Sequence, residues 1–288
     1  MKKIIAVAVA GAFAAPVMAA DVTISGNLEY VFVSDDQANT SDFIAEDAVV
    51  SVGASSELAN GMTISSSINI ENTDEASATV SDGGNNVTIS GDFGTLAIGD
   101  VSGALDATGD WTDVAAYYGG FDADGDDAAF AFTPSLGIDG VKAVISATPE
   151  GDANNPEGTS YSVTYSTGAF SVYYGKDETA AAADQMSAAG LKYSADGIMI
   201  AYETGESPAD SSGKIEFKGV AATYTMGDLK FALEMQEQTD DGTVDSDETT
   251  MSATYDLGGG ATVYIVNTGD DKTSTKVDKT AIGINYAF

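Results

Sequence analysis

The sequence VTISGNLEY, residues 22–30, places apolar residues or glycine at even positions and polar residues at odd positions. Successive side chains of a β-strand point to opposite faces, so this stretch predicts a strand with one apolar and one polar face. The same alternation returns at residues 62–71, 161–165, 229–236 and 282–288. The sequence therefore predicts an all-β protein.

Short glycine-bearing turns and long acidic loops alternate along the chain. The seven turns lie at residues 60–61, 91–94, 134–140, 167–169, 195–197, 227–228 and 257–260. The eight loops lie near residues 34–47, 72–85, 100–127, 149–158, 176–188, 204–214, 238–247 and 268–277. Together they join sixteen strands, with short connections at one rim and long connections at the other. This plan is typical of an antiparallel transmembrane β-barrel of the outer-membrane type, and a barrel of this size leaves an aqueous channel.

The alternation alone also fits a soluble secreted β-sandwich, whose polar faces point outward. In a membrane barrel the apolar face meets lipid and the polar face meets a watery lumen. Aromatic residues gather at the predicted strand ends, as they do in interfacial girdles. These aromatic residues are Tyr30, Phe32, Phe130, Phe132, Tyr174, Tyr202 and Tyr255. Together with the strict alternation of turns and loops, they favour the membrane barrel.

The chain begins with two lysines, an apolar run from Ile4 to Ala15 and small residues up to Ala20. This order predicts a signal peptide. We place it at residues 1–19, with cleavage after Ala19 or alternatively after Ala20, and the barrel domain at residues 20–288. The apolar run is shorter than the roughly 20 residues that a membrane-spanning helix needs. The mature chain is therefore expected to be exported.

The composition argues against an enzyme. The sequence has no histidine and no cysteine, so Ser-His-Asp and Cys-His catalysis and histidine-ligated zinc are impossible. Paired carboxylates could in principle cut glycosides, but the acids are scattered over loops. The net charge of −34 would repel nucleic acid and favours cations as partners or permeant ions.

The segment from Val87 to Asp100, VTISGDFGTLAIGD, resembles a strand–turn–strand of the Gram-negative general porins, which typically carry G-x-F-G-T-x-x-x-G-R before their third loop. The start at Val22 and the final Tyr-Ala-Phe are also similar, so the resemblance spans the mature chain. It implies a homotrimer of sixteen-stranded barrels in the outer membrane, each narrowed by a third loop that folds inward. It also implies that the barrel-assembly machinery reads Phe288.

The third loop, residues 100–127, is the longest connection that we predict, and loops of this length are usually functional or disordered. It carries eight aspartates, no basic residue and the only tryptophan, Trp111. If the loop folds inward, several aspartates line the pore constriction. If it stays outside, they form a solvated acidic surface. We select Asp106, Asp110 and Asp113 from the middle of the loop, together with Asp100.

The sequence departs from the family where selectivity is set. Asp100 stands where the family motif ends in arginine, and no lysine or arginine lies between Lys3 and Lys142. The alternation points Glu29 and Glu71 into the lumen. Because rings of carboxylates select cations, we expect a cation-selective pore.

Lysines reach the lumen face only later in the sequence. We expect Lys142, Lys230 and Lys279 there, with Glu203 and Glu234 as potential ion-pair partners. Tyr173 and Tyr264 are also expected to face inward, but two aromatic side chains are too few to predict a substrate-specific track.

The sequence around Asp122, Asp124 and Asp126 resembles the start of a calcium loop, but its glycine and its twelfth residue do not fit an EF-hand. These three aspartates remain candidates for weak calcium binding, against the alternative of a solvated acidic loop. No other cofactor is expected. The acidic rim would also suit divalent cations shared with lipopolysaccharide in the surrounding outer-membrane lipid.

The function that follows is a water-filled channel for ion transport and for small hydrophilic solutes. Two alternatives remain open on the sequence. A substrate-specific outer-membrane channel would discriminate among sugars, and a structural or adhesive barrel with a plugged lumen would not conduct at all.

Overall fold

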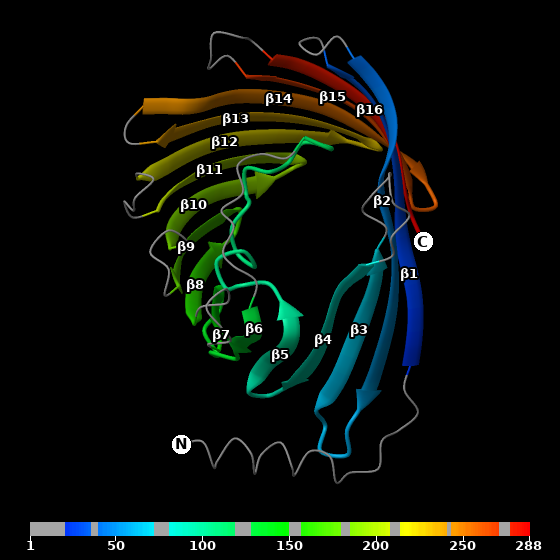
Figure 1. Cartoon of the computed structure of the whole chain (residues 1–288). Helices are drawn as coiled ribbons and strands as arrows, with labels where there is room; N and C mark the ends of the chain where they lie inside the picture. Colours follow the sequence, from blue (N-terminus) through cyan, green and yellow to red (C-terminus); the bar gives the residue numbers. More distant parts are fainter. Residues whose placement is uncertain are drawn as a thin grey trace.

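A computed structural model shows sixteen antiparallel strands (Figure 1). It describes residues 21–35, 40–71, 81–118, 128–149, 157–179, 185–207, 214–240, 243–270 and 277–288. The strands are β1 (Asp21–Asp35), β2 (Thr40–Glu57), β3 (Thr63–Glu71), β4 (Ser81–Gly91), β5 (Gly94–Val101), β6 (Ala128–Pro134), β7 (Val141–Thr148), β8 (Gly158–Thr167), β9 (Phe170–Thr179), β10 (Met186–Ala195), β11 (Ile198–Glu206), β12 (Ile215–Met226), β13 (Leu229–Asp240), β14 (Thr243–Gly258), β15 (Ala261–Asp270) and β16 (Val277–Ala287).

Each strand pairs with its neighbours in sequence, and β1 pairs with β16, so the sheet closes into a barrel. The seam runs from the pair Asn27 and Ala287 to the pair Asp35 and Lys279. Two backbone hydrogen bonds between Gly26 and Phe288, at 2.9 and 3.0 Å, extend the seam to the last residue. Closure leaves no unpaired edge strand, which a membrane-spanning sheet requires.

The inside and the outside of the barrel differ as the alternation predicts. On β11, Ile200 is 51% exposed and points outward, whereas its neighbour Ala201 is 1% exposed. Large apolar side chains cover the outer surface, while small and polar residues such as Ser162 are buried inside. This inversion suits lipid outside and rules out the soluble sandwich. Among the residues that the structure describes, no helix is both long and apolar enough to cross a bilayer.

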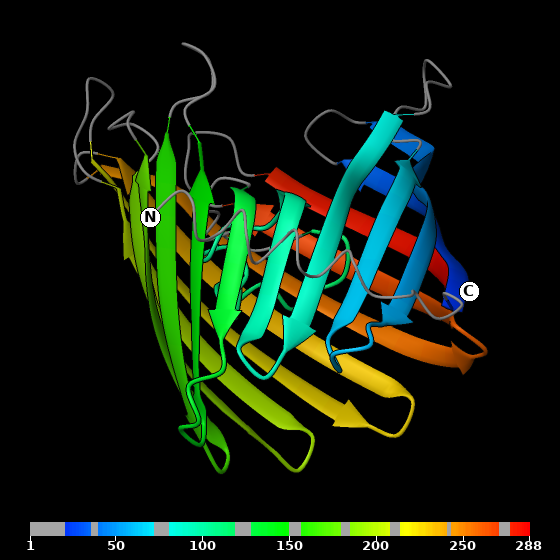
Figure 2. The same ribbon diagram turned by 90° about the horizontal axis from the view of Figure 1, so that it is seen from below.

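All seven predicted turns are confirmed, and in Figure 2 they lie together at one end of the barrel. The turn between β4 and β5 contains Gly94 at a φ of +116°, a backbone conformation that a residue with a Cβ atom rarely adopts. This backbone conformation explains why the family motif has glycine at this position.

Several predicted loop boundaries are wrong. The connection placed near 238–247 is only residues 241–242, and strands also extend into the regions predicted as loops near 34–47 and 72–85. Asp100 lies inside β5, one residue before its end, and not in the third loop. The strands can extend into these acidic regions because β-sheet hydrogen bonds join backbone groups and do not depend on the side chains.

Candidate pore constriction

The third loop connects β5 to β6, and its described part, residues 102–118, lies inside the barrel (Figure 1). Its first segment forms a single turn, in which the amides of Ala107 and Gly109 donate to the carbonyls of Gly103 and Leu105, both at 2.9 Å. Ala104 and Leu105 are 0% exposed. The inward path that the family resemblance implied is thus confirmed.

Hydroxyl groups of the barrel wall hold the start of the loop. The Ala104 amide donates to Ser146 Oγ on β7 at 2.8 Å, and the Leu105 amide donates to Ser160 Oγ on β8 at 3.0 Å. The next inward position of β8 is Ser162, whose hydroxyl lies 2.6 Å from that of Thr108. Buried backbone amides need such acceptors, so these serines fix where the loop lies.

An apolar cluster packs the same segment against the wall. Leu105 belongs to one buried cluster with Tyr173, Ala188 and Phe217 of the wall. Glycine makes room for it, since a Cβ atom on Gly175 would lie 2.6 Å from Leu105 Cδ1. A glycine inside a strand often marks a close approach of this kind.

The middle of the loop is bound by the carboxylate of Glu203 on β11. Glu203 Oε2 accepts hydrogen bonds from the Thr112 amide at 2.7 Å and from the Thr112 hydroxyl at 2.9 Å. Its other oxygen accepts one from the hydroxyl of Tyr173. Gly219 allows the approach, because its Cβ position lies 3.0 Å from Thr112 Cβ. Glu203 is 1% exposed, and these donors compensate its burial.

A second wall carboxylate, Glu234 on β13, receives the next part of the loop. Its Oε1 accepts from the amides of both Val114 and Ala115. The Val114 carbonyl accepts from Lys230 Nζ at 2.8 Å. The wall therefore binds the loop backbone through both its donors and its acceptors.

Trp111 packs between the loop and the wall. Its ring meets Tyr173 edge-on, with 4.7 Å between the ring centroids and an interplanar angle of 69°. Lys192 on β10 places its Nζ 4.1 Å from the centre of the Trp111 ring. This contact has the geometry of a cation–π interaction, and it places the lysine beneath the loop.

The end of the described loop reaches the seam of the barrel. The ring of Tyr117 stacks on Tyr264 with 6.5 Å between centroids, and the hydroxyl of Tyr264 donates to Glu29 Oε1. Burial, the Glu46 carboxylate and the neighbouring Tyr118 raise the pKa of the Tyr117 hydroxyl. Burial and the carboxylate of Asp35 raise that of Tyr118. Both phenols are therefore neutral near pH 7.

Two loop residues have left-handed backbones, Asp110 with φ of 62° and Tyr117 with φ of 67°. Such a conformation is uncommon for Asp and a genuine outlier for a bulky residue like Tyr. It costs of order 1–3 kcal/mol and persists only where surrounding contacts determine the path. Here the hydrogen bonds and packing contacts between the loop and the barrel wall fix the path of the loop.

A family model described as Gram-negative porin matches residues 6–286. The chain belongs to the Gram-negative porin family. The porin is accordingly a channel protein of the outer membrane. No curated protein sequence matches it.

Solved porin structures share the fold. A multiple mutant of the porin from Rh. blastica is similar with a TM-score of 0.77 at 13% identity, covering 93% of this chain and 100% of that chain. A loop-deletion mutant of OmpT, an outer membrane protein of Vibrio cholerae, gives a TM-score of 0.78 at 14% identity, covering 94% of this chain and 100% of that chain.

The predicted constriction residues of the porin occupy three settings. Asp106 and Asp110 lie half-buried on the docked loop, and Asp113 is exposed on it. Asp100 is exposed at the end of β5, beside Gly84. The three loop aspartates thus belong to the segment that lies inside the barrel, and Asp100 belongs to the wall.

The two predicted glutamates lie on the barrel wall. Glu29 lies on β1 at the seam of the porin, where its carboxylate accepts hydrogen bonds from the Tyr264 hydroxyl and from Asn285 Nδ2, the latter at 3.4 Å. Glu71 is half-buried at the end of β3. Its inward neighbour Asn69 accepts a hydrogen bond from Ser51 at 2.8 Å, so this part of the wall is polar and closely bonded.

The calcium candidates Asp122, Asp124 and Asp126 lie outside the described residues. Within the described ranges, no group of three or more His, Cys, Asp and Glu side chains is placed to hold a metal ion.

The prediction that lumen lysines pair with Glu203 and Glu234 is wrong. Glu203 accepts hydrogen bonds from the third loop and from Tyr173, and Glu234 accepts them from the third loop. Lys279 instead lies 3.9 Å from Asp35. Lys192 is a further lumen lysine that the predictions did not include, and the alternation of Leu191, Lys192 and Tyr193 was the signal that could have located it. The glycines inside β9 and β12 were the available signal for a docked loop.

Proposed function

We propose that the porin forms a cation-selective diffusion channel for ions and small hydrophilic solutes. The observation that carries the proposal is the distribution of charge around the lumen. Acidic residues lie on the third loop, and the strands from β1 to β6 contain no lysine or arginine at all. Four described lysines reach the lumen, from β7, β10, β13 and β16. Lys192 of β10 and Lys230 of β13 contact the loop, and Lys279 of β16 lies 3.9 Å from the carboxylate of Asp35.

The selectivity residues of this proposal are Asp106, Asp110 and Asp113 on the loop, with Asp100, Glu29 and Glu71 on the wall. A cation that passes the loop meets carboxylates on one side and neutral or acidic groups on the other. Since exposed carboxylates attract cations over a Debye length of about 10 Å at 0.1 M salt, the field reaches across much of a narrow pore.

The test is the reversal potential of single channels across a salt gradient in planar bilayers. Asp110→Asn removes one charge and keeps a residue that tolerates the left-handed backbone. Asp196→Asn is the matched control, because Asp196 also has a positive φ, of 53°, but lies in a short turn. We expect the first change to lower the cation preference and the control to leave it unchanged. Anion preference in the wild type would refute the proposal.

The same single-channel recordings distinguish the general diffusion channel from two other functions. A plugged structural barrel would give no conductance. A substrate-specific channel would show a current that one sugar blocks and others do not, whereas a general channel admits uncharged sugars according to size.

We also propose that the porin assembles as a homotrimer. β3, β4 and β5 contain no Tyr, Trp or Phe, whereas every strand from β8 to β14 contains at least one. The outward residues of this sector, such as Ile68 and Val87, are aliphatic and exposed. Since lipid-facing strands carry interfacial aromatics, this sector suits contact with another copy. Ile68→Trp should overfill this contact and weaken the oligomer in native electrophoresis, whereas Ile200→Trp on the far side should leave it intact.

Three further proposals come from the sequence. Residues 1–19 are removed on export, which N-terminal sequencing of the mature porin would check. Phe288 is read by the barrel-assembly machinery, so its deletion should slow membrane insertion. The acidic loops bind Ca²⁺ weakly and share divalent cations with lipopolysaccharide, and a calorimetric titration without heat would contradict that.

A further inference from the structure

Three buried side-chain atoms in the described part of the chain have no hydrogen-bond partner there. They are the hydroxyl of Tyr118 on the third loop, and Oε2 of Glu234 and Nε2 of Gln236 on β13. Glu234 is only 1% exposed, so Oε2 carries the free-energy cost of a buried polar atom without a partner. Such an atom marks a place where a ligand would supply the missing contact.

Strand register brings the two β13 side chains next to Glu248 on β14. Gln236 lies directly opposite Glu248, and Glu234 lies opposite Thr250, the next inward residue of β14. Diagonal neighbours on one face of an antiparallel pair are about 7–8 Å apart. Glu234 and Glu248 are therefore neighbours on the lumen face, and Glu248 lies one row nearer the rim that carries the long loops.

A tight turn in the third loop brings Tyr118 to the same place. The Tyr118 amide donates to the Ala116 carbonyl at 2.8 Å, and the Ala116 amide donates to Ser252 Oγ on β14 at 3.2 Å. Burial raises the pKa of the Tyr118 hydroxyl, and three carboxylates, with that of Glu248 among them, raise it further. The hydroxyl therefore keeps its proton and presents a neutral oxygen in a negative field.

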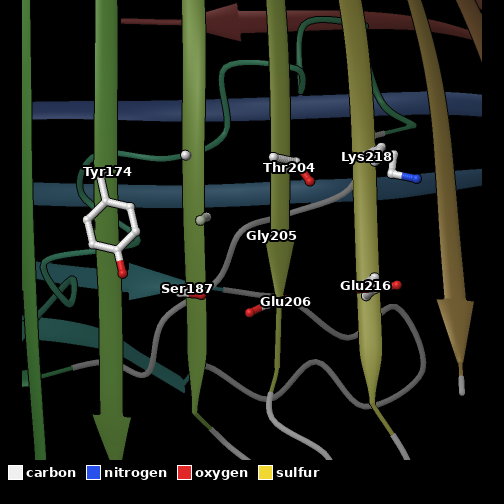
Figure 3. Close-up of a pocket in the computed structure, with 9 residues that line it drawn as sticks. Tyr174, Ser187, Thr204, Gly205, Glu206, Glu216 and Lys218 are labelled. Carbon is white, nitrogen blue, oxygen red and sulfur yellow. The ribbon is translucent and has the colours of Figure 1, made fainter.

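Lysines compensate glutamates on the outer face of the barrel but not at this place. Glu206 and Glu216, which lie beside the outer groove shown in Figure 3, both pair with Lys214 Nζ, at 2.7 and 2.8 Å. Of the lysines that the structure describes, none forms an ion pair with Glu234 or Glu248. A ligand between these two carboxylates must therefore be positively charged.

The oxygen atoms at this place suit a cation of low charge. Glu234 Oε1 already accepts two loop amides, and Glu248 Oε1 accepts from the Thr250 hydroxyl at 3.1 Å, so one oxygen of each carboxylate remains. Gln236 can present its amide oxygen by turning the amide group over. Ca²⁺ takes six to eight oxygen ligands, and no group of three acidic side chains in the described ranges is placed to hold a metal ion.

We propose that this place binds a monovalent metal cation such as potassium, with Glu234, Gln236, Glu248 and Tyr118 as its ligands. The site rests on the proposed function and deepens it, because it gives a permeant cation a resting position on the long-loop side of the docked loop. Conduction needs sites that bind an ion well enough to admit it and weakly enough to release it. The bound cation also joins the end of the described loop to the wall.

The test is the anomalous scattering of thallium(I), used in place of potassium, in crystals of the whole porin. The wild type should show a thallium peak between Glu234 and Glu248, and Glu248→Gln should lose it. Tyr118→Phe removes a hydroxyl that bonds no described residue, so it leaves the fold intact and should lower the occupancy of the peak. Glu237→Gln is the matched control, since Glu237 is on the same strand but pairs with Lys218 at 3.8 Å, and it should keep the peak.

Single-channel conductance of each variant shows that its barrel has folded. Water alone at this place in the wild type, or a thallium peak that persists in Glu248→Gln, would overturn the site. A peak obtained with Ca²⁺ but not with thallium(I) would overturn the monovalent class of ligand. The reversal potential tests selectivity separately: a thallium peak without cation preference would support the site and refute the proposed selectivity, whereas cation preference without the peak would overturn the site alone.

Discussion

One oxygen of the Glu203 carboxylate accepts hydrogen bonds from the amide and the hydroxyl of Thr112, and the other oxygen accepts one from the Tyr173 hydroxyl. Replacement by alanine leaves the buried Thr112 amide without an acceptor, which costs about 1–3 kcal/mol. We expect Glu203→Ala to loosen the third loop and to give a larger, noisier single-channel current. Glu203→Gln keeps an acceptor for the amide and should restore a quiet channel.

A purely steric role for Glu203 would make any side chain of similar size equivalent. Glu203→Met keeps the size but supplies no oxygen acceptor, so it should be as noisy as Glu203→Ala. A quiet Glu203→Met channel in single-channel recordings would contradict the hydrogen-bonding role.

Tyr117 makes the docked loop sensitive to strong alkali. The pKa of its hydroxyl is raised above the ordinary value of 10.0, chiefly by burial and then by Glu46. A raised pKa means that the docked loop retains the proton more tightly than the undocked loop. Its stabilising contribution is complete below pH 10.0 and is lost as the pH rises through the raised pKa.

We expect constant single-channel noise from about pH 7 to about pH 9, and increasing noise above about pH 10, the ordinary pKa of tyrosine. Tyr117→Phe has no ionisable group and should shift the increase to higher pH. An increase that begins near neutral pH would assign it to another group.

At the scale of elements, the third loop can be locked chemically. The Cβ position of Gly219 lies 3.0 Å from Thr112 Cβ, close to the roughly 3.5–4.5 Å that a disulfide requires. We expect Thr112→Cys with Gly219→Cys to cross-link the loop to β12 without changing the conductance, since the loop already lies there. Thr112→Cys alone is the control.

A conductance that changes on reduction of this cross-link would show that the loop leaves the wall during conduction. The chain contains no cysteine of its own, so no other disulfide competes.

The strands and turns could be predicted because their signals are local. Alternation fixes the face of each residue, and a turn such as the one before Gly94 needs a glycine within a few residues. Loop lengths were overestimated where polar residues extend the strands, as at β13 and β14. The docking of the loop depends on partners far apart in sequence, such as Thr112 and Glu203, which are 91 residues apart. No single-sequence pattern pairs a backbone amide with a distant carboxylate.

For the whole molecule, the acidic lumen predicts a dependence on salt. The Debye length falls from about 10 Å at 0.1 M to about 3 Å at 1 M. We therefore expect the cation preference, measured as the reversal potential at a fixed concentration ratio, to fall steeply over this range. A preference that is the same at both salt concentrations would indicate selection by close coordination and not by the field of the carboxylates.

The wall carboxylates of the porin bind amides of the third loop backbone, at Thr112, Val114 and Ala115. Every amino acid except proline supplies such an amide. At these positions the wall therefore holds the loop by its backbone, while side chains such as Leu105, Trp111 and Tyr117 add contacts elsewhere in the loop. Descendants of this chain can exchange one permeation chemistry for another by point substitutions in the loop, while the support that positions it is inherited unchanged. The same property makes the loop a replaceable module for engineered pores, provided that proline is kept out of those three positions.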